Sequence, residues 1–383
     1  MNKDYLKAYS KSSADEKILY LLALSVFLPY YITALILVAV FLYVVFKGKL
    51  EGEFTKNGRV AIIIFTLYSI AVALLYSNYV GALCSLAFFM LIYIAAYARK
   101  KYSAESFEKV LDICALCGPI TAVLCFIEYI HLYLTSDANA ELRCQLFYFN
   151  SNYLATVLGT VIIICAYKVI MKKRNMFFYF VSAMITAFGA YLTGSMFVWI
   201  EVFVGCAVLL MVSRKQQLLS ILMLLAGVAT IVLYFIPDIL PRIEHASGTT
   251  NNRIKIWTVC IDAIKKTPIF GRGFLTYFHI HTDYPNSYVS THAHNIPMEF
   301  IMSFGIVGTI ILVVFFAIYY KRIFVCRNAQ SKYYFSSITI ALTAAIAAHG
   351  LIDLTFMWVQ TGLLYCLLMS GFGVEERLLK IDH

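Results

Sequence analysis

The sequence predicts an all-α polytopic membrane protein, with about 11–12 transmembrane helices and one long loop that carries an amphipathic helix. Three observations support this fold class. The 383-residue chain is 61% hydrophobic and only 14% charged, whereas soluble domains are roughly one-quarter charged. Its mean hydropathy is +0.79, and its charges lie in clusters between long apolar runs. This composition excludes soluble nucleic-acid binders, disordered chains and secreted disulfide-rich domains.

The apolar runs after residue 59 are each long enough to cross a hydrocarbon core of roughly 30 Å as a helix. Barrel strands would instead alternate in polarity over about ten residues. The predicted helices cover residues 60–76, 80–98, 110–134, 152–170, 176–192, 195–212, 217–236, 298–320, 335–353 and 356–373. Together with the N-terminal run, they are expected to form a single transmembrane domain over residues 1–383.

The N-terminal apolar run, residues 18–46, has basic residues on both sides. Both flanks are therefore expected on the same face of the membrane, which requires an even number of crossings. Pro29, near the middle of the run, favours a short helical hairpin, and one long kinked span is the alternative. A cleavable signal peptide is not expected, because the run is too long and no small-residue cleavage site follows it.

Lysine and arginine predict which connections face the cytoplasm. The basic connections are 47–59, 99–109, 168–174, 214–215, 321–332 and 377–380. The short connections between them lack basic residues or, in one case, hold only Arg143: 77–79, 135–151, 193–194 and 354–355. This alternation places the basic connections and the C-terminus in the cytoplasm. The net charge of +10 is therefore a topology signal that predicts membrane lipids, and no nucleic acid, as partners.

One connection, residues 237–297, is much longer than the others, and the alternation places it outside. Loops of this length in compact proteins are usually functional. The loop also collects most of the eight histidines: His245, His279, His281, His292 and His294. His131 and His349 lie near the outer ends of predicted helices, and only His383 lies elsewhere. We therefore expect residues 237–297 to be an extracytoplasmic catalytic loop.

Residues 253–266 of this loop predict an amphipathic helix on the membrane surface. Ile254, Trp257, Ile261 and Ile264 recur at three- and four-residue spacing, and charged side chains occupy the other face. The indole of Trp257 is expected at the depth of the lipid headgroups.

His294 lies just before the next predicted helix. Pro297 suits the first turn of that helix, so Asn295 or the residue after it should cap it. Backbone N–H groups at a helix N-terminus favour an anion, and Arg253 and Arg272 can supply forked donors to phosphate. A neutral imidazole beside such a site is suited to act as a general base opposite a diphosphate leaving group.

Several short motifs occur in a fixed order between residues 192 and 309. They are Leu192-Thr193-Gly194-Ser195, Asn252-Arg253 before Trp257, Pro268-Ile-Phe-Gly271-Arg-Gly273-Phe274, His294-Asn295 and Gly305-x-x-Gly308. This order resembles the O-antigen ligase and O-antigen polymerase family of bacterial membrane glycosyltransferases, with residues 192–320 as the ligase-like core. One position departs from the family pattern, since Met196 stands where the family usually has an arginine.

The resemblance implies transfer or polymerisation of an undecaprenyl-diphosphate-linked glycan on the outer face of the bacterial plasma membrane. The acceptor would be a glycan or a lipid-glycan. The family's loop histidine is assigned to the acceptor and its arginines to the diphosphate, so His294 is the expected catalytic residue. Arg253, Arg272 and Asn295 are the expected diphosphate-binding residues. The implied reaction is a single displacement that needs no metal and no other cofactor.

Four further polar residues could line the same cavity: Ser195, Glu201, His292 and His349. Glu201 lies within a predicted span, where a carboxylate is either functional or hydrogen-bonded within the bundle. Two local pairs are expected from three- and four-residue spacing, namely Glu128 with His131 and His349 with Asp353.

The sequence also allows other interpretations of these residues. The pairs His292-x-His294 and His279-x-His281 could bind a metal, but only Asp283 offers a further ligand nearby, so no metal is expected. Cys144 and Cys260 both fall outside the spans and could form a disulfide. The Gly305/Gly308 pair predicts a close approach between helices. A multi-span transporter or flippase of lipid-linked or small sugars is the alternative function; it should carry inverted repeats and charged, broken helices at the midplane.

Overall fold

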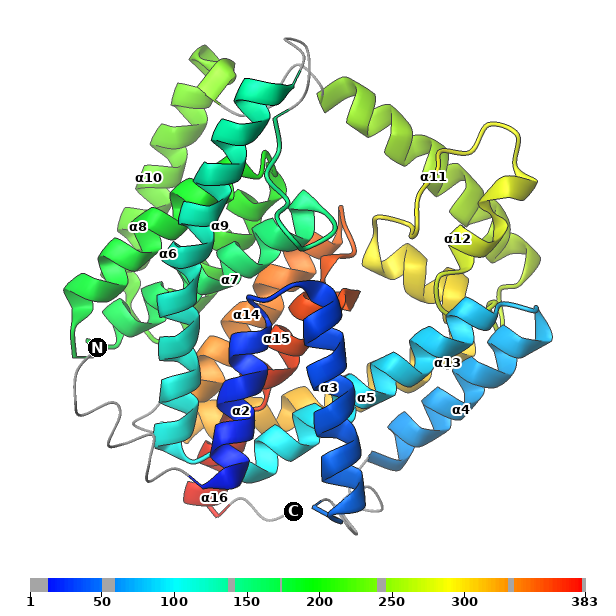
Figure 1. Cartoon of the computed structure of the whole chain (residues 1–383), viewed down its shortest axis with the longest axis horizontal. Coiled ribbons are helices and arrows are strands. Elements are labelled where there is room, and N and C mark those ends of the chain that lie inside the picture. Colours follow the sequence, from blue (N-terminus) through cyan, green and yellow to red (C-terminus); the bar gives the residue numbers. More distant parts are fainter. Residues whose placement is uncertain are drawn as a thin grey trace.

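The computed structural model describes residues 13–49, 59–136, 142–172, 174–239, 246–329 and 334–380. All regular elements of this described part are helices (Figure 1), which confirms an all-α polytopic membrane protein. The α-helices are α2 (Ala14–Ser25), α3 (Tyr30–Phe46), α4 (Arg59–Leu75), α5 (Tyr79–Lys101), α6 (Ala104–Thr135), α7 (Ser151–Ile170), α8 (Met176–Leu192), α9 (Phe197–Val212), α10 (Gln216–Phe235), α11 (Ala246–Lys266), α12 (Thr276–Ile280), α13 (Ile296–Asn328), α14 (Phe335–Gly350), α15 (Val359–Met369) and α16 (Phe372–Leu378).

Five of these helices are long and apolar enough to cross a membrane: α5, α6, α7, α10 and α13. The other predicted spans coincide with shorter apolar helices. The predicted span 356–373 differs, because it contains the 3-10 turn η5 (Thr355–Met357), α15 and the start of α16. Ser370 ends α15, and its hydroxyl donates to the carbonyl of Ala95 in α5 (2.8 Å).

The N-terminal run forms the predicted hairpin, with α2 and α3 side by side (Figure 1). Ser13 and Glu16 form a capping box at the start of α2, and Pro29 is the N-cap of α3. The Thr33 hydroxyl donates to Ser25 O across the turn (2.6 Å), which ties the two helices together. The prediction of a hairpin, rather than one kinked span, is confirmed.

The largest core includes residues of α2, α3, α5, α6, α7, α8, α9, α14 and α15. Within it, α6 and α8 pack against each other and against α7, and α9 packs against α7 and α14 (Figure 1). Helix α7 is buried along most of its length, whereas α10 packs against α9 and has no buried residue. An apolar helix can leave its side chains exposed in this way when lipid surrounds it, because its backbone groups are satisfied within the helix.

The long loop folds around α11, α12 and two 3-10 turns, η2 (Pro237–Ile239) and η4 (His281–Asp283). Helix α11 contains the predicted amphipathic segment and starts before it. Its buried face is Ile256, Val259, Cys260 and Ala263, which pack with residues of α12 and α13. Ile254 and Ile261 are exposed as expected. Trp257 instead packs against the buried cluster, and its indole N–H donates to Ala293 O (3.0 Å).

Helix α13 breaks at Gly305, whose φ of 61° is left-handed. Ile306 N–H donates to Pro268 O (2.9 Å) and Val307 N–H to Ile269 O (3.1 Å), so the Pro268–Gly271 segment caps the second half of α13. A Cβ at Gly305 would lie 2.3 Å from Ile269 O. The predicted close approach at this glycine is confirmed, although its partner is a loop backbone.

Gly308 provides the contact between helices. A Cβ at this position would lie 2.6 Å from the ring of Tyr68 in α4. The Tyr68 hydroxyl lies 2.7 Å from both Phe270 O and Phe304 O. The glycines of this region therefore join α4, α13 and the loop before α12 at a point where side chains would not fit.

The ten cysteines are free thiols in the described part of the chain. Cys144 does not bond to Cys260; its thiol donates to Cys125 O (3.1 Å). The disulfide considered between Cys144 and Cys260 is therefore not formed.

Candidate functional site

The segment that precedes α13 presents two histidines at the end of the bundle that carries the long loop. Asn295 caps α13, since its side-chain oxygen accepts from Met298 N–H (2.9 Å), and Pro297 lies in the first turn as predicted. The Asn295 amide also donates to Leu351 O (2.8 Å), which ties this segment to the end of α14. His294 adopts a left-handed conformation with φ of 50°, a strained geometry of the kind often found at functional sites.

Both histidines converge on the carboxylate of Asp353. His294 Nδ1 lies 2.8 Å and His292 Nε2 3.1 Å from Asp353 Oδ1. The backbone N–H of Leu354 donates to the same oxygen (2.8 Å), and the Asn152 amide donates to Oδ2 (2.6 Å). Asp353 is 1% exposed. Burial alone would raise the pKa of its carboxyl, but the two imidazoles outweigh burial and hold that pKa well below its usual range.

This arrangement assigns the protons of both imidazoles. An ionised carboxylate only accepts hydrogen bonds, so the neutral form of His294 has its proton on Nδ1 and a lone pair on Nε2 that can act as a base. His292 carries its proton on Nε2, and its Nδ1 accepts from the Thr291 hydroxyl (2.8 Å). The side chain of His294 is 20% exposed, so a substrate can approach it. An imidazole oriented by a buried carboxylate is the base of the Ser-His-Asp hydrolases.

A second layer of hydrogen bonds holds Asp353 in place. Asn152 lies in the first turn of α7, and its side-chain oxygen accepts from the Arg143 guanidinium (2.8 Å). Arg143 also donates through Nε to Thr193 O (3.0 Å). The Leu192–Ser195 turn is thereby connected to Asp353 through two side chains. Ser195 itself is buried, and its backbone N–H donates to the Thr193 hydroxyl (3.2 Å).

Glu201 and His349 form a separate buried pair, with 2.6 Å between Glu201 Oε2 and His349 Nδ1. The side chains are 0% and 1% exposed, respectively. This confirms a hydrogen bond of Glu201 within the bundle. The expected pair of His349 with Asp353 exists only in the backbone, where Asp353 N–H donates to His349 O (3.0 Å). The Asp353 side chain lies beyond the end of α14 at Gly350 and turns toward the loop histidines.

The expected pair of Glu128 with His131 is also wrong. The Glu128 carboxylate accepts from the backbone N–H groups of Gln145 and Leu146 (2.9–3.1 Å). Both residues belong to the segment between α6 and α7, where free N–H groups are better partners for a carboxylate than a neighbouring side chain on the same helix.

The two loop arginines lie against aromatic rings at different places. The Arg253 guanidinium lies 4.9 Å from the centre of the Phe197 ring at the start of α9, close enough for its charge to act on His349. The Arg272 guanidinium lies 5.1 Å from the Tyr76 ring centre. Its Nε is buried without a hydrogen-bond partner among the described residues. Neither arginine has a hydrogen bond to His294 in this part of the chain.

The remaining loop histidines do not join the cluster. His279 Nε2 lies 3.0 Å from Tyr76 O, and His281 Nδ1 lies 2.9 Å from Phe278 O. His245 lies outside the described residues. Among the described residues, the group able to hold a metal is His292, His294 and Asp353, whose donor atoms lie within 4.8 Å of one another.

Residues 181–313 match a family model described as O-antigen ligase. This segment of the chain is therefore similar to the O-antigen ligase family. The match begins in α8 and ends in α13, and it includes Ser195, Glu201, Arg253, Arg272 and His294. No curated protein matches the chain.

The matched segment contains His294 but not the residues that orient it. Asp353, Asn152 and Arg143 all lie outside the matched segment. Sequence reasoning singled out none of them as site residues. Each of these residues lies at the end of a predicted span or in a non-basic connection, on the side of the membrane where the histidines are expected. This shared position is the signal in the sequence that could have identified them.

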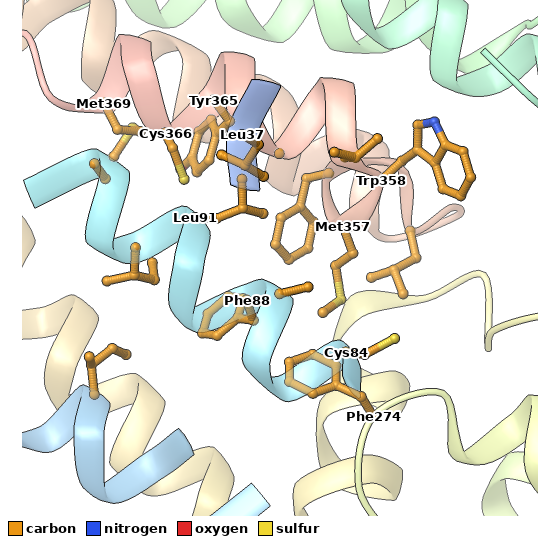
Figure 2. Close-up of a pocket in the computed structure, with 18 of the residues that line it drawn as sticks. Leu37, Cys84, Phe88, Leu91, Phe274, Met357, Trp358, Tyr365, Cys366 and Met369 are labelled. Carbon is orange, nitrogen blue, oxygen red and sulfur yellow. The ribbon is translucent and has the colours of Figure 1, made fainter. Parts of the chain in front are cut away.

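An apolar cavity of about 490 Å³ has His292 in its lining, and Figure 2 shows the apolar side chains that surround it. Thr291, His292 and Leu354 line one end of it. Helix α5 forms one wall from Cys84 to Arg99, a length of about 22 Å at 1.5 Å per residue. Figure 2 shows Phe88 and Leu91 of this wall with Tyr365 and Cys366 of α15 nearby. At the far end, Arg99 and Arg322 both bind the buried Glu376 carboxylate.

Proposed function

We propose that this protein transfers or polymerises a glycan from undecaprenyl diphosphate on the outer face of the bacterial plasma membrane, with His294 as general base. The proposal depends mainly on one observation, the 2.8 Å contact between His294 Nδ1 and Asp353. This contact leaves His294 Nε2 as the proton acceptor. The match of residues 181–313 to the O-antigen ligase family supports a lipid-linked glycan as the substrate.

In the proposed reaction, His294 Nε2 removes the proton from an acceptor hydroxyl of a glycan or lipid-glycan. The oxygen attacks the anomeric carbon of the donor sugar, the bond from that carbon to the diphosphate oxygen breaks, and undecaprenyl diphosphate leaves. A single displacement inverts the configuration at the anomeric carbon. Asp353 stabilises the imidazolium that forms, so the step uses a protein base and needs no metal.

The diphosphate would be bound by Arg253 and Arg272. Each guanidinium lies against an aromatic ring, which orients its planar fork toward a phosphate. The buried, unpartnered Nε of Arg272 is a donor that a phosphate oxygen could satisfy. Asn295 would contribute through the helix end, since its amide caps α13 and binds Leu351 O. Arg143 places a further guanidinium at the turn before Met196, where the family usually has an arginine.

The polyprenyl chain of the donor would lie in the apolar cavity, which begins at His292 and runs along α5. A chain of isoprene units gains free energy from such a surface, about 25 cal/mol for each Å² of apolar area removed from water. The cavity and the histidine cluster adjoin, so a donor could place its diphosphate near the base and its chain among the helices. Residues 237–297 would then face the outside.

The experiment is a transfer assay with purified protein in vesicles that contain an undecaprenyl-diphosphate-linked glycan. The expected result is a glycan-extended acceptor with release of undecaprenyl diphosphate in equal amount. Counterflow of the free sugar or flipping of the intact lipid, with no transfer product from any acceptor, would contradict the proposal and support a transporter or flippase.

A further inference from the structure

We propose that His292, His294 and Asp353 also form an inhibitory site for a divalent cation of the Zn²⁺ class. Binding of the ion rests on the geometry of these three side chains alone. The inhibition rests on the proposed function, since it requires that His294 is the base. The cation would be a regulator that competes with catalysis and not a cofactor of the reaction.

The donor atoms suit a zinc ion. Imidazole nitrogens and carboxylate oxygens bind Zn²⁺ at about 2.0–2.2 Å in a tetrahedral arrangement, in which donor atoms lie about 3.3 Å apart. The two imidazole nitrogens already lie 2.8 Å and 3.1 Å from Asp353 Oδ1. All three donor atoms lie within 4.8 Å of one another, so side-chain rotations alone would admit the ion. The fourth ligand would be water or an acceptor hydroxyl, because His294 is partly exposed.

The surrounding hydrogen bonds favour a bound cation. Asn152 donates to Asp353 Oδ2 (2.6 Å), so this carboxylate keeps its orientation when Oδ1 binds the ion. The Thr291 hydroxyl lies 2.8 Å from His292 Nδ1. This contact orients the ring so that its other nitrogen, Nε2, can bind the ion. Such outer contacts commonly raise the affinity of a metal site by about 10–100-fold. His292 and Asp353 are both buried, which shields the ion from water.

The positions of the imidazole protons explain why the ion would inhibit glycan transfer. A metal bound at His294 Nδ1 displaces the proton from that nitrogen to Nε2, so the atom that acted as a base becomes a donor. At His292 the proton moves from Nε2 to Nδ1, where it is donated to the Thr291 hydroxyl. Both imidazoles remain neutral and no proton has to leave the site. One bound ion thus removes the base without any change in fold.

The binding test uses the full-length protein in detergent after removal of metals with a chelator. Equilibrium dialysis measures bound Zn²⁺, and the visible absorption of Co²⁺ reports a tetrahedral site. We expect one ion per chain, with affinity at least about tenfold weaker in His292→Gln and several-fold weaker in Thr291→Val. His279→Gln is the matched control, because this histidine lies in the same loop but binds Tyr76 O, and its affinity should equal that of the wild type.

Three outcomes would overturn the proposal: no bound ion in the wild type, an equal loss of affinity in His279→Gln and His292→Gln, or full transfer activity at saturating Zn²⁺. Thr291→Val keeps all three ligands, so it remains informative if His292→Gln fails to fold. Stoichiometric Zn²⁺ binding by a protein that shows no transfer even without metal would uphold the ion site and contradict the proposed function of His294.

Discussion

Asp353 accepts four hydrogen bonds, three of them on one oxygen. Because two of the donors are imidazole nitrogens, the charge of this carboxylate decides which nitrogen of each histidine carries the proton. Replacement of Asp353 by asparagine keeps the shape of the side chain. It also introduces an N–H₂ group that can donate to His294 Nδ1 and select the wrong tautomer.

We therefore expect Asp353→Asn to lower transfer by about 10²–10⁴-fold, as for other catalytic histidines that lose their carboxylate. The measurement is single-turnover transfer with saturating donor. Glu128→Gln is the control, since this carboxylate also binds backbone N–H groups but outside the cluster, and its rate should stay near that of the wild type. An unimpaired Asp353→Asn protein would show that His294 needs no orienting carboxylate.

The arginines are tested by conservative replacement. Lysine retains the positive charge at Arg253 and Arg272 but loses the planar fork that stacks on Phe197 and Tyr76. We expect Arg253→Lys and Arg272→Lys to weaken transfer severely at subsaturating donor and to leave expression intact. Lys255→Ala and Lys265→Ala should have mild effects. An equal loss in all four variants would mean that the general positive charge of the loop binds the donor.

At the residue scale the sequence correctly predicted the helix start after His294, because capping and proline signals are local. It did not assign Asp353 to the site. The contact between His294 and Asp353 spans 59 residues, and spacing of three or four residues suggested a helical pair with His349 instead. Helix α14 ends at Gly350, so Asp353 lies outside the helix on which such a side-chain pair depends. The residue at which a helix ends is difficult to predict from sequence.

At the scale of elements, the glycine motif in α13 acts through its backbone, because Gly305 breaks the helix. The break at Gly305 exposes N–H groups of the second half of the helix, and the Pro268–Gly271 segment supplies carbonyls to them. The same segment leads to Arg272, whose backbone N–H donates to Ser303 O (3.1 Å). The break therefore fixes both the helix that follows His294 and the loop that carries Arg272.

Gly305→Ala should destabilise the protein by at least about 2 kcal/mol, because alanine disfavours a left-handed φ and its Cβ would meet Ile269 O at 2.3 Å. The measurement is thermal unfolding in detergent, where we expect a midpoint lower by several degrees. Gly227→Ala is the matched control. A Cβ there meets nothing within 4 Å, so its midpoint should be unchanged or slightly higher. Equal midpoints for both variants would contradict the role of the break.

Hydrophobic runs predicted nearly every long helix, since burial in lipid requires the same feature that a pattern search detects. The runs could not predict how the helices pack. The spacing of Trp257 predicts that it lies on the membrane face of its helix. In the structure it packs inward, and its indole N–H donates to Ala293 O. The buried face of α11 depends on contacts with α12 and α13, which no single segment contains.

For the whole molecule, the charge alternation predicts that the α7–α8 connection is cytoplasmic and that the long loop is outside. In a cysteine-free background, Ser287→Cys should react with a membrane-impermeant thiol reagent in intact cells. Lys172 is exposed and Ser287 partly exposed, and Lys172→Cys should react only after permeabilisation. Labelling of Lys172→Cys in intact cells with none at Ser287→Cys would reverse the orientation and place the histidine cluster on the cytoplasmic side.

The most direct measurement compares transfer by His294→Ala, His294→Asn and the wild type, each purified and reconstituted with undecaprenyl-diphosphate-linked donor and acceptor. If His294 is the general base, both variants should lose about 10²–10⁴-fold in single-turnover rate and keep the wild-type unfolding midpoint, because neither side chain can take the proton. Near-normal turnover by His294→Ala would show that the base lies elsewhere, and it would contradict the mechanism built on Asp353 and His294.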